Sequence, residues 1–219
     1  MKKSILTIMC TMLFTTFGCA NAQTNQVSPQ TEPSTTETAL PKVYFYKKMS
    51  AENLIEIYEA LGRKAEGKVA VKLSTGEPGG HNFLQPALIK DLVQQVGGTI
   101  VECNTAYGGG RSDTESHLKA AADHGFTAIA PVVIMDAEGE LPVKGGKHLT
   151  RDIVGKDFLN YDFVIILSHF KGHAMGGFGG AIKNMSIGIA SSNGKRLIHS
   201  AGTSTTSWGN PAQDDFLES

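Results

Sequence analysis

Segments typical of strands alternate with segments typical of helices from residue 42 to residue 168, and this alternation restricts the fold more than any other feature. Short apolar runs are followed by amphipathic runs, each of which ends at a glycine. Strands in such an order usually lie parallel in one sheet whose faces are covered by the helices. The sequence therefore predicts a three-layer α/β domain with a mostly parallel sheet.

Five segments are expected to form strands and three to form helices. The strands are residues 42–46, 68–74, 99–103, 127–135 and 163–168, and the helices are residues 50–62, 86–97 and 112–125. Ser50 is expected to cap the first helix and Asp113 the third. Short polar side chains at these positions accept hydrogen bonds from the free amides at a helix start.

Residues 1–22 have the pattern of a signal peptide. Two lysines precede a short apolar run, residues 5–17, which is too short to cross a membrane comfortably. Two cleavage sites compete: one follows Ala22, and the other precedes Cys19, which would then carry a lipid. Either route predicts an exported protein in the periplasm, outside the cell or on the outer face of a membrane as a lipoprotein. The lipid anchor would be its one contact with the membrane.

Residues 23–41 are rich in Thr, Gln, Ser, Pro and Glu and contain few apolar side chains. Such a segment buries too little surface to offset its ordering entropy, so we expect a disordered linker. The α/β domain then occupies residues 42–219. Its last residues, 210–219, resemble a helix start with no helix after it, which predicts that the natural chain continues further.

Charge and cysteine content restrict the possible partners and cofactors. The chain has 20 basic and 21 acidic residues, so a nucleic acid is not an expected partner. Cys10 and Cys19 lie in the expected signal peptide, which leaves Cys103 alone in the domain. One thiolate cannot hold an iron–sulfur cluster. Cys103 follows a strand and is expected to be a small core residue rather than a nucleophile.

Three glycine-rich loops that carry charged side chains follow expected strands. They are residues 74–83, 104–117 and 168–188. Ligands of open α/β sheets bind beyond the carboxyl ends of the strands, so the three loops predict one shared site. The first loop supplies Glu77 and His81. The second supplies Arg111, whose guanidinium suits a carboxylate or a phosphate.

The third loop, "SHFKGHAMGGFGGAIK", combines glycines with histidines and lysines. Glycines allow backbone N–H groups to approach an anion closely, and lysines add positive charge. The candidates for acid–base catalysis are His169, His173 and Lys183. The candidates for binding an anionic small molecule are Lys171, Gly176, Gly177, Gly179, Gly180, Arg111, Glu77 and His81.

The histidines and the loop as a whole each allow two interpretations. His169 and His173 can serve as hydrogen-bonding or acid–base groups, or they can bind a divalent metal with His81 or His117 as a third ligand. The protein is accordingly either an exported enzyme that acts on an anionic small molecule, or a non-catalytic binding or redox-accessory protein.

The three loop regions resemble a family of bacterial and archaeal proteins known as domain of unknown function 362. The matching stretches are "KLSTGEPGGHNFLQPALIKDLV", "CNTAYGGGRSDTESHLKAAADHGF" and "SHFKGHAMGGFGGAIKNMSIG". Members are often labelled uncharacterised iron–sulfur centre proteins, and many carry a ferredoxin-like insertion with cysteine ligands. Because this chain lacks those cysteines, no iron–sulfur cluster is expected here. The resemblance also implies that a ferredoxin-like or C-terminal segment is a possible partner that this chain does not contain. It implies a fold and a site, but no reaction.

Overall fold

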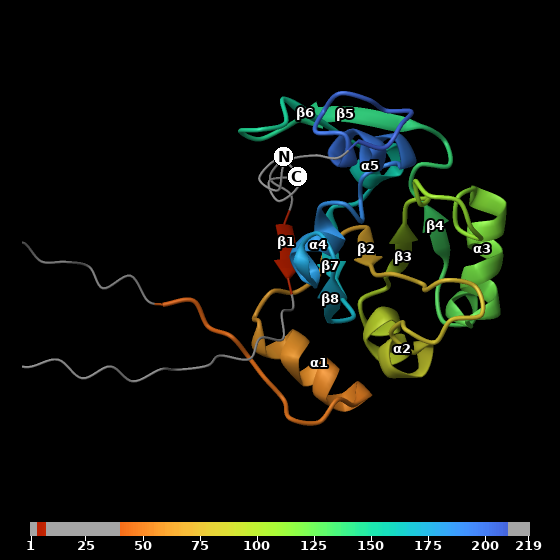
Figure 1. Cartoon of the computed structure of the whole chain (residues 1–219). Helices are drawn as coiled ribbons and strands as arrows, with labels where there is room; N and C mark the ends of the chain where they lie inside the picture. Colours follow the sequence, from red (N-terminus) through yellow and green to blue (C-terminus); the bar gives the residue numbers. More distant parts are fainter. Residues whose placement is uncertain (1–3, 8–39, 210–219) are drawn as a thin grey trace, which may run out of the picture.

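The computed structural model describes residues 4–7 and 40–209. The three expected helices form where the sequence places them (Figure 1): they are α1 (Ala51–Ala60), α2 (Pro86–Gln95) and α3 (Thr114–Asp123). The Ser50 hydroxyl accepts a hydrogen bond from the Asn53 amide at 3.2 Å. The Asp113 carboxylate accepts one from the Ser116 amide at 2.9 Å. Both predicted caps are therefore confirmed.

The main sheet is parallel throughout, in the order β1-β7-β2-β3-β4. Its strands are β1 (Ser4–Thr7), β7 (Phe163–Ile166), β2 (Val69–Lys72), β3 (Thr99–Glu102) and β4 (Val132–Ile134). In the centre of the sheet, Val71 lies opposite Ile165 on one side and Ile100 on the other. The prediction of a parallel sheet with helices against it is confirmed.

The two faces of the sheet bury different layers of the core. Side chains alternate between faces along a strand, so Val69 and Val71 pack with apolar residues of α1, α2 and α3, while Ala70 faces the opposite layer. That second layer includes Ala181 of a short helix, α4 (Ala181–Met185). The alternation also assigns Lys72 to the second face, at the carboxyl end of its strand. A charged side chain is thus placed where the predicted site lies.

Two of the predicted strands are wrong in whole or in part. Residues 42–46 form no strand. Residues 44–49 form a strap that is tied to α1, where the Asn53 side chain donates to the Lys48 carbonyl at 2.8 Å. Their aromatic side chains suit a strand, but they contact a groove instead of a neighbouring strand. The expected strand 127–135 is shortened to β4 because its first part forms the 3-10 helix η1 (Phe126–Ala128) and Pro131 offers no amide to a ladder.

Several elements were not predicted. They are the antiparallel pair β5 (Glu140–Lys144) and β6 (Arg151–Gly155), the 3-10 helix η2 (Lys156–Asn160), the hairpin of β8 (Lys171–His173) and β9 (Gly177–Gly179), and the helices α4 and α5 (Ser192–His199). The pair β5–β6 and α5 lie together at one end of the molecule (Figure 1). A small apolar cluster there includes Leu149, Ile187 and Ile198.

Most of the terminal segments lie outside the described residues. This holds for Cys19, for nearly all of the expected signal peptide and linker, and for residues 210–219. Ser4–Thr7 is described and runs parallel to β7 at its otherwise free edge. Within the described part of the chain, no helix has the length and apolar character needed to cross a membrane.

Candidate functional site

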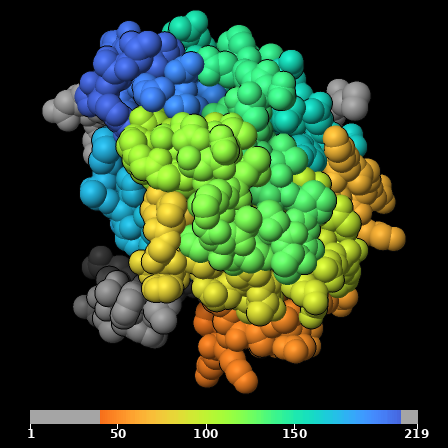
Figure 2. All heavy atoms as spheres, turned by 90° about the vertical axis from the view of Figure 1, so that its right-hand side faces the viewer, coloured from red at the N-terminus to blue at the C-terminus, as the bar shows by residue number. Residues whose placement is uncertain are grey.

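The three glycine-rich loops meet at the carboxyl edge of β7, β2 and β3, as predicted. Side chains from all three line one cavity with a volume of about 300 Å³, among them Ser74, Arg111 and Lys183. The loops after β2 and β3 lie side by side, with Glu77 ion-paired to Arg111, and they are adjacent in the space-filling view (Figure 2). The parallel order of the strands therefore produces a shared cavity from segments far apart in the sequence.

The cavity contains most, but not all, of the candidate residues. The candidates that line it are Arg111, His169, Lys171, His173, Gly179, Gly180 and Lys183. Glu77 instead holds Arg111 through an ion pair, and His81 is exposed outside the cavity lining. Gly176 and Gly177 belong to the β8–β9 turn region, where the Gly176 amide donates to Nδ1 of His173 at 3.0 Å. The Gly176 amide is thus engaged by the protein itself rather than by a ligand.

Positive charge dominates the cavity. The described lining residues include five lysine or arginine side chains but one carboxylate, Glu102. The five are Lys72, Arg111, Lys171, Lys183 and Lys195. Lys72 and Lys195 were missed by sequence reasoning. A lysine inside the apolar strand "VAVKL" was a usable signal for Lys72, since a buried lysine needs a specific partner.

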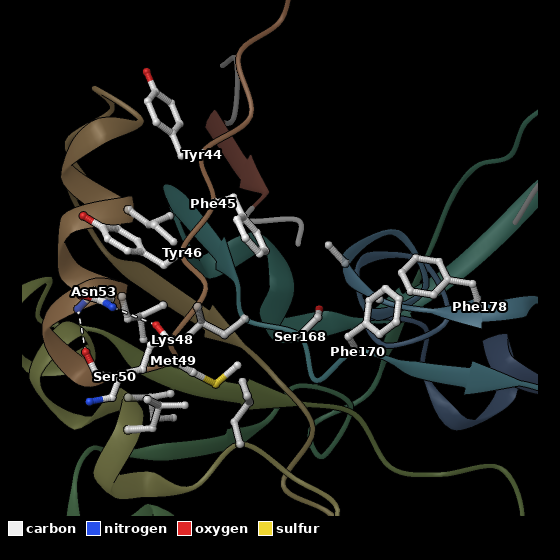
Figure 3. Close-up of a pocket in the computed structure, with 18 residues that line it drawn as sticks. Tyr44, Phe45, Tyr46, Lys48, Met49, Ser50, Asn53, Ser168, Phe170 and Phe178 are labelled. Carbon is white, nitrogen blue, oxygen red and sulfur yellow. Dashed lines mark hydrogen bonds between the residues drawn. The ribbon is translucent and has the colours of Figure 1, made fainter. Parts of the chain in front are cut away.

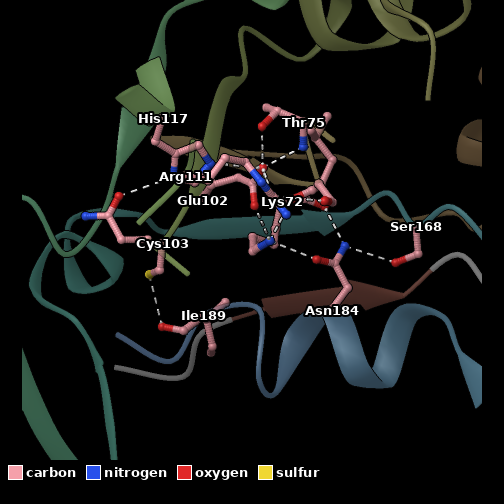
Figure 4. Close-up of polar contacts among 12 residues, drawn as sticks. Lys72, Thr75, Glu102, Cys103, Arg111, His117, Ser168, Asn184 and Ile189 are labelled. Atoms are coloured by element: carbon pink, nitrogen blue, oxygen red, sulfur yellow. Dashed lines mark hydrogen bonds and ion pairs between the residues drawn. The ribbon is translucent and has the colours of Figure 1, made fainter. Parts of the chain in front are cut away.

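Lys72 is the most deeply buried of these cations, with 1% of its surface exposed. Its Nζ donates to the Leu73 carbonyl at 2.6 Å and to Oδ1 of Asn184 at 2.8 Å, and lies 3.8 Å from Oε2 of Glu102 (Figure 4). Burial lowers the pKa of the Lys72 amine, and the Glu102 carboxylate opposes that change. The amine is held at the floor of the site by three oxygen atoms.

Glu102 connects the cations of the first two loops. Its Oε1 accepts hydrogen bonds from the amide and hydroxyl of Thr75, at 2.5 and 2.7 Å, and lies 3.5 Å from Nη1 of Arg111. Nε2 of His117 is also 3.5 Å from Oε1. Burial alone would raise the pKa of Glu102, but Lys72, His117 and Arg111 together lower it well below its ordinary value. Glu102 is therefore ionised and already shared among these groups.

Asn184 joins α4 to the ends of two strands. Its Nδ2 donates to the carbonyls of Lys72 and Leu167, at 3.2 and 3.1 Å, and to the Ser168 hydroxyl at 3.0 Å. With Oδ1 receiving the Lys72 amine, the whole amide group of Asn184 is engaged. This network fixes α4, and with it Lys183, relative to the sheet edge.

Lys183 and His173 are the titratable groups of the third loop that the surroundings perturb. Burial and the neighbouring Lys171, Lys195 and Lys72 lower the pKa of Lys183 to about 8. Burial, then Lys183 and Lys171, also lower the pKa of His173. Because the Gly176 amide donates to Nδ1 of His173, the neutral ring carries its proton on Nε2. His173 is thus arranged as a hydrogen-bond donor rather than as a base.

The helix α5 contributes Lys195 and one further missed residue, His199, to the cavity. Lys195 Nζ donates to the Ala190 carbonyl, and burial lowers the pKa of this amine. Nδ1 of His199 donates to the Lys195 carbonyl at 2.6 Å, and its ring packs edge-on against Trp208. The sequence did contain a signal: Ser191 caps α5 by accepting from the Gly194 amide at 3.0 Å.

Cys103 and the histidines do not form a metal-binding cluster. The described residues contain no group of three or more His, Cys, Asp or Glu side chains placed to hold a metal ion. His117, one expected third ligand, is buried between Glu102 and Asn104. Burial raises the pKa of the Cys103 thiol to about 12, so it is a poor nucleophile, as predicted.

The fold and the cavity define a class of protein: an α/β domain with a parallel sheet and a cation-lined cavity at the carboxyl edge of that sheet. A family model for a domain of unknown function, DUF362, matches residues 69–218, and the chain belongs to this family. The match includes all three loops, so the resemblance seen in the sequence is confirmed. No curated protein and no solved structure is similar enough to this chain to count as a match.

Proposed function

We propose that this domain binds a small anionic organic molecule in the cation-lined cavity. The main observation that supports this proposal is the imbalance of charge. The described lining residues include five lysine and arginine side chains but one carboxylate. That carboxylate, Glu102, is already shared by Lys72 and Arg111. The remaining cations, Lys171, Lys183 and Lys195, would find their compensating charge in a ligand.

The energetic argument rests on burial. Removing a cation from water costs free energy unless a partner compensates for the lost hydration. Lys195 is 8% exposed, and its amine donates to a carbonyl rather than to a carboxylate. Lys183 faces three other lysines that disfavour its charge. A fold under selection for stability alone would not gather these amines, whereas an anion bound among them would relieve their repulsion.

Lys183 is the group we propose for proton exchange with the ligand. With a pKa of about 8, both its charged and neutral forms are populated near neutral pH, which is what a general acid or base needs. His173 would instead donate a hydrogen bond from Nε2. Of the three acid–base candidates of the sequence, His169, His173 and Lys183, this assignment favours the lysine. A group that exchanges protons near neutral pH supports an enzyme over a passive binder.

Calorimetric titration of the protein with sulfate, phosphate, lactate and a divalent metal tests the binding proposal. Lys183→Met should weaken anion binding by about 1.5–3 kcal/mol, the value of one charged hydrogen bond. Lys90→Met is the matched control, since Lys90 is an exposed lysine on α2, outside the cavity lining. If wild type binds none of the anions, or both variants bind like wild type, the proposal fails.

We also propose that the protein is exported through its N-terminal segment. The support is the sequence pattern of residues 1–22, with two lysines, a short apolar run and small residues. Expressing the full chain with Cys19→Ala separates the two cleavage routes. Loss of membrane attachment would support lipidation at Cys19, and unchanged release into the soluble fraction would support cleavage after Ala22.

A further inference from the structure

An apolar groove (Figure 3) shares two lining residues, Ser168 and Gly180, with the cation-lined cavity. It has a volume of about 140 Å³ and is bounded by the strap, by α1 and α2, and by the β8–β9 hairpin. We define the strap as residues 44–49. The groove side chains are mainly aromatic and aliphatic, and include Phe45, Met49, Leu88 and Phe170.

The β8–β9 hairpin separates the groove from the cavity and presents a different face to each. Phe170 and Phe178 line the groove, with ring centroids 4.4 Å apart, whereas Lys171, His173 and Gly179 line the cavity. This alternation follows from strand geometry, because successive side chains point to opposite faces. One short hairpin therefore supplies an apolar wall on one side and a cationic wall on the other.

The two spaces adjoin at the base of the hairpin. Ser168 and Gly180 line both of them. A Cβ atom at position 180 would lie 2.6 Å from Cζ of Phe178, so only glycine lets this ring pack over the junction. A ligand that occupied both spaces would therefore have to cross at the base of the hairpin, beside the Phe178 ring.

The chemistry of the groove favours an apolar occupant. Phe45, Met49 and Phe170 are 54%, 73% and 58% exposed, which leaves large apolar surfaces in contact with water. Two of the polar side chains there are already engaged: Asn53 donates to the Lys48 carbonyl, and the Ser168 hydroxyl accepts from Asn184. An alkyl chain, which needs no hydrogen bonds, fits these surroundings.

We propose that the ligand of this site is an amphipathic anion, bound as a single molecule, with its charged group in the cavity and its apolar chain in the groove. This inference rests on the proposed anion-binding function and specifies the class of ligand. Charge complementarity places the head among Lys171, Lys183 and Lys195, and the lining shared at Ser168 and Gly180 places the crossing of the chain at the base of the hairpin.

Methyl sulfate and octyl sulfate, the latter below its micelle concentration, test the inference because they carry the same charge and differ in chain length. Octyl sulfate should bind wild type at least about tenfold more tightly, which corresponds to about 1.4 kcal/mol. Phe45→Ser should reduce that advantage and leave methyl sulfate affinity unchanged. Leu159→Ser, which removes a similarly exposed (55%) apolar side chain outside the groove, should change neither.

The outcomes separate this inference from the function on which it rests. If neither probe binds, the anion-binding proposal fails. Equal binding of the two probes, or an octyl advantage that survives Phe45→Ser, overturns the inference and leaves anion binding in place. Lys183→Met must weaken the binding of both probes. If the affinity for octyl sulfate is the same in this variant as in wild type, the sulfate group lies outside the cavity and the inference is overturned. Binding to vesicles containing sulfated lipid, without binding of monomeric octyl sulfate, would likewise overturn single-molecule binding.

Discussion

The affinity of the cavity for sulfate should fall as the pH rises through about 8. Lys183 has a pKa of about 8 in the free protein because of burial and the lysines around it. Sulfate does not titrate in this range, so a change in affinity reports on the protein. Only the protonated amine attracts the anion. The contribution of Lys183 is therefore fully present below its pKa in the free protein and is lost as the pH rises from there through its higher pKa in the complex.

The expected size of the loss is that of one charged hydrogen bond, about 1.5–3 kcal/mol, or roughly ten- to a hundredfold in the dissociation constant. Bound sulfate should also raise the pKa of Lys183. Binding at pH 8 should then take up as much as about half a proton, since half of the free amines are neutral at their pKa. Calorimetry in two buffers with different ionisation enthalpies measures this uptake directly.

Lys183→Met is the decisive comparison, because other groups also face the anion. Lys171, Lys195, Lys72 and His173 line the same cavity, and any fall in affinity that they cause would persist in the variant. The fall that begins near pH 8 and the proton uptake should both disappear with Lys183. A flat profile in wild type, or the same fall in the variant, would refute the reasoning.

Three further results are expected. Without ligand, Lys183→Met should be more stable than wild type by about 1 kcal/mol, because it removes one of several repelling cations. The melting temperature should rise by about 2–4 °C, and a lower melting temperature would contradict this. Glu102→Gln should cost about 3–5 kcal/mol in urea unfolding, since buried Lys72 and Arg111 lose their shared carboxylate, and a loss below about 1 kcal/mol would show that the carboxylate is not their counterion. A chain that starts at Pro41 should unfold in one cooperative thermal transition, because the described core clusters use residues 54–198; loss of that transition would mean that the N-terminal segment is part of the core.

The parts of the fold that could be read from the sequence are those with local signals. The cap at Ser50 and the apolar run of Val69, Ala70 and Val71 specify their elements without reference to distant residues. The aromatic run 42–46 has strand propensity too, but whether it pairs depends on the edges available in the folded sheet. A short hairpin such as β8–β9 depends in the same way on packing that no local pattern describes.

The sequence predicted the location of the candidate site, but only some of its residues. The order of loops on a parallel sheet predicted that Arg111 and Lys183 would meet, and they line one cavity. Lys195 was not predicted because the helix α5 was not predicted. Lys72 was not predicted because it lies within an apolar strand, whose residues are expected to belong to the core. The engagement of Arg111 by Glu77 was also beyond the sequence, since both residues were expected to bind the ligand.

The alternation in the β8–β9 hairpin has a consequence for how its two neighbours communicate. Phe178 lines the groove, and the next residue of the same strand, Gly179, lines the cavity. An occupant of the groove that displaced the ring would therefore also shift the backbone at the cavity wall. Occupancy of the two spaces by separate molecules would therefore be thermodynamically linked, and the linkage must be reciprocal: an alkane that alters sulfate affinity is itself altered by sulfate to the same degree.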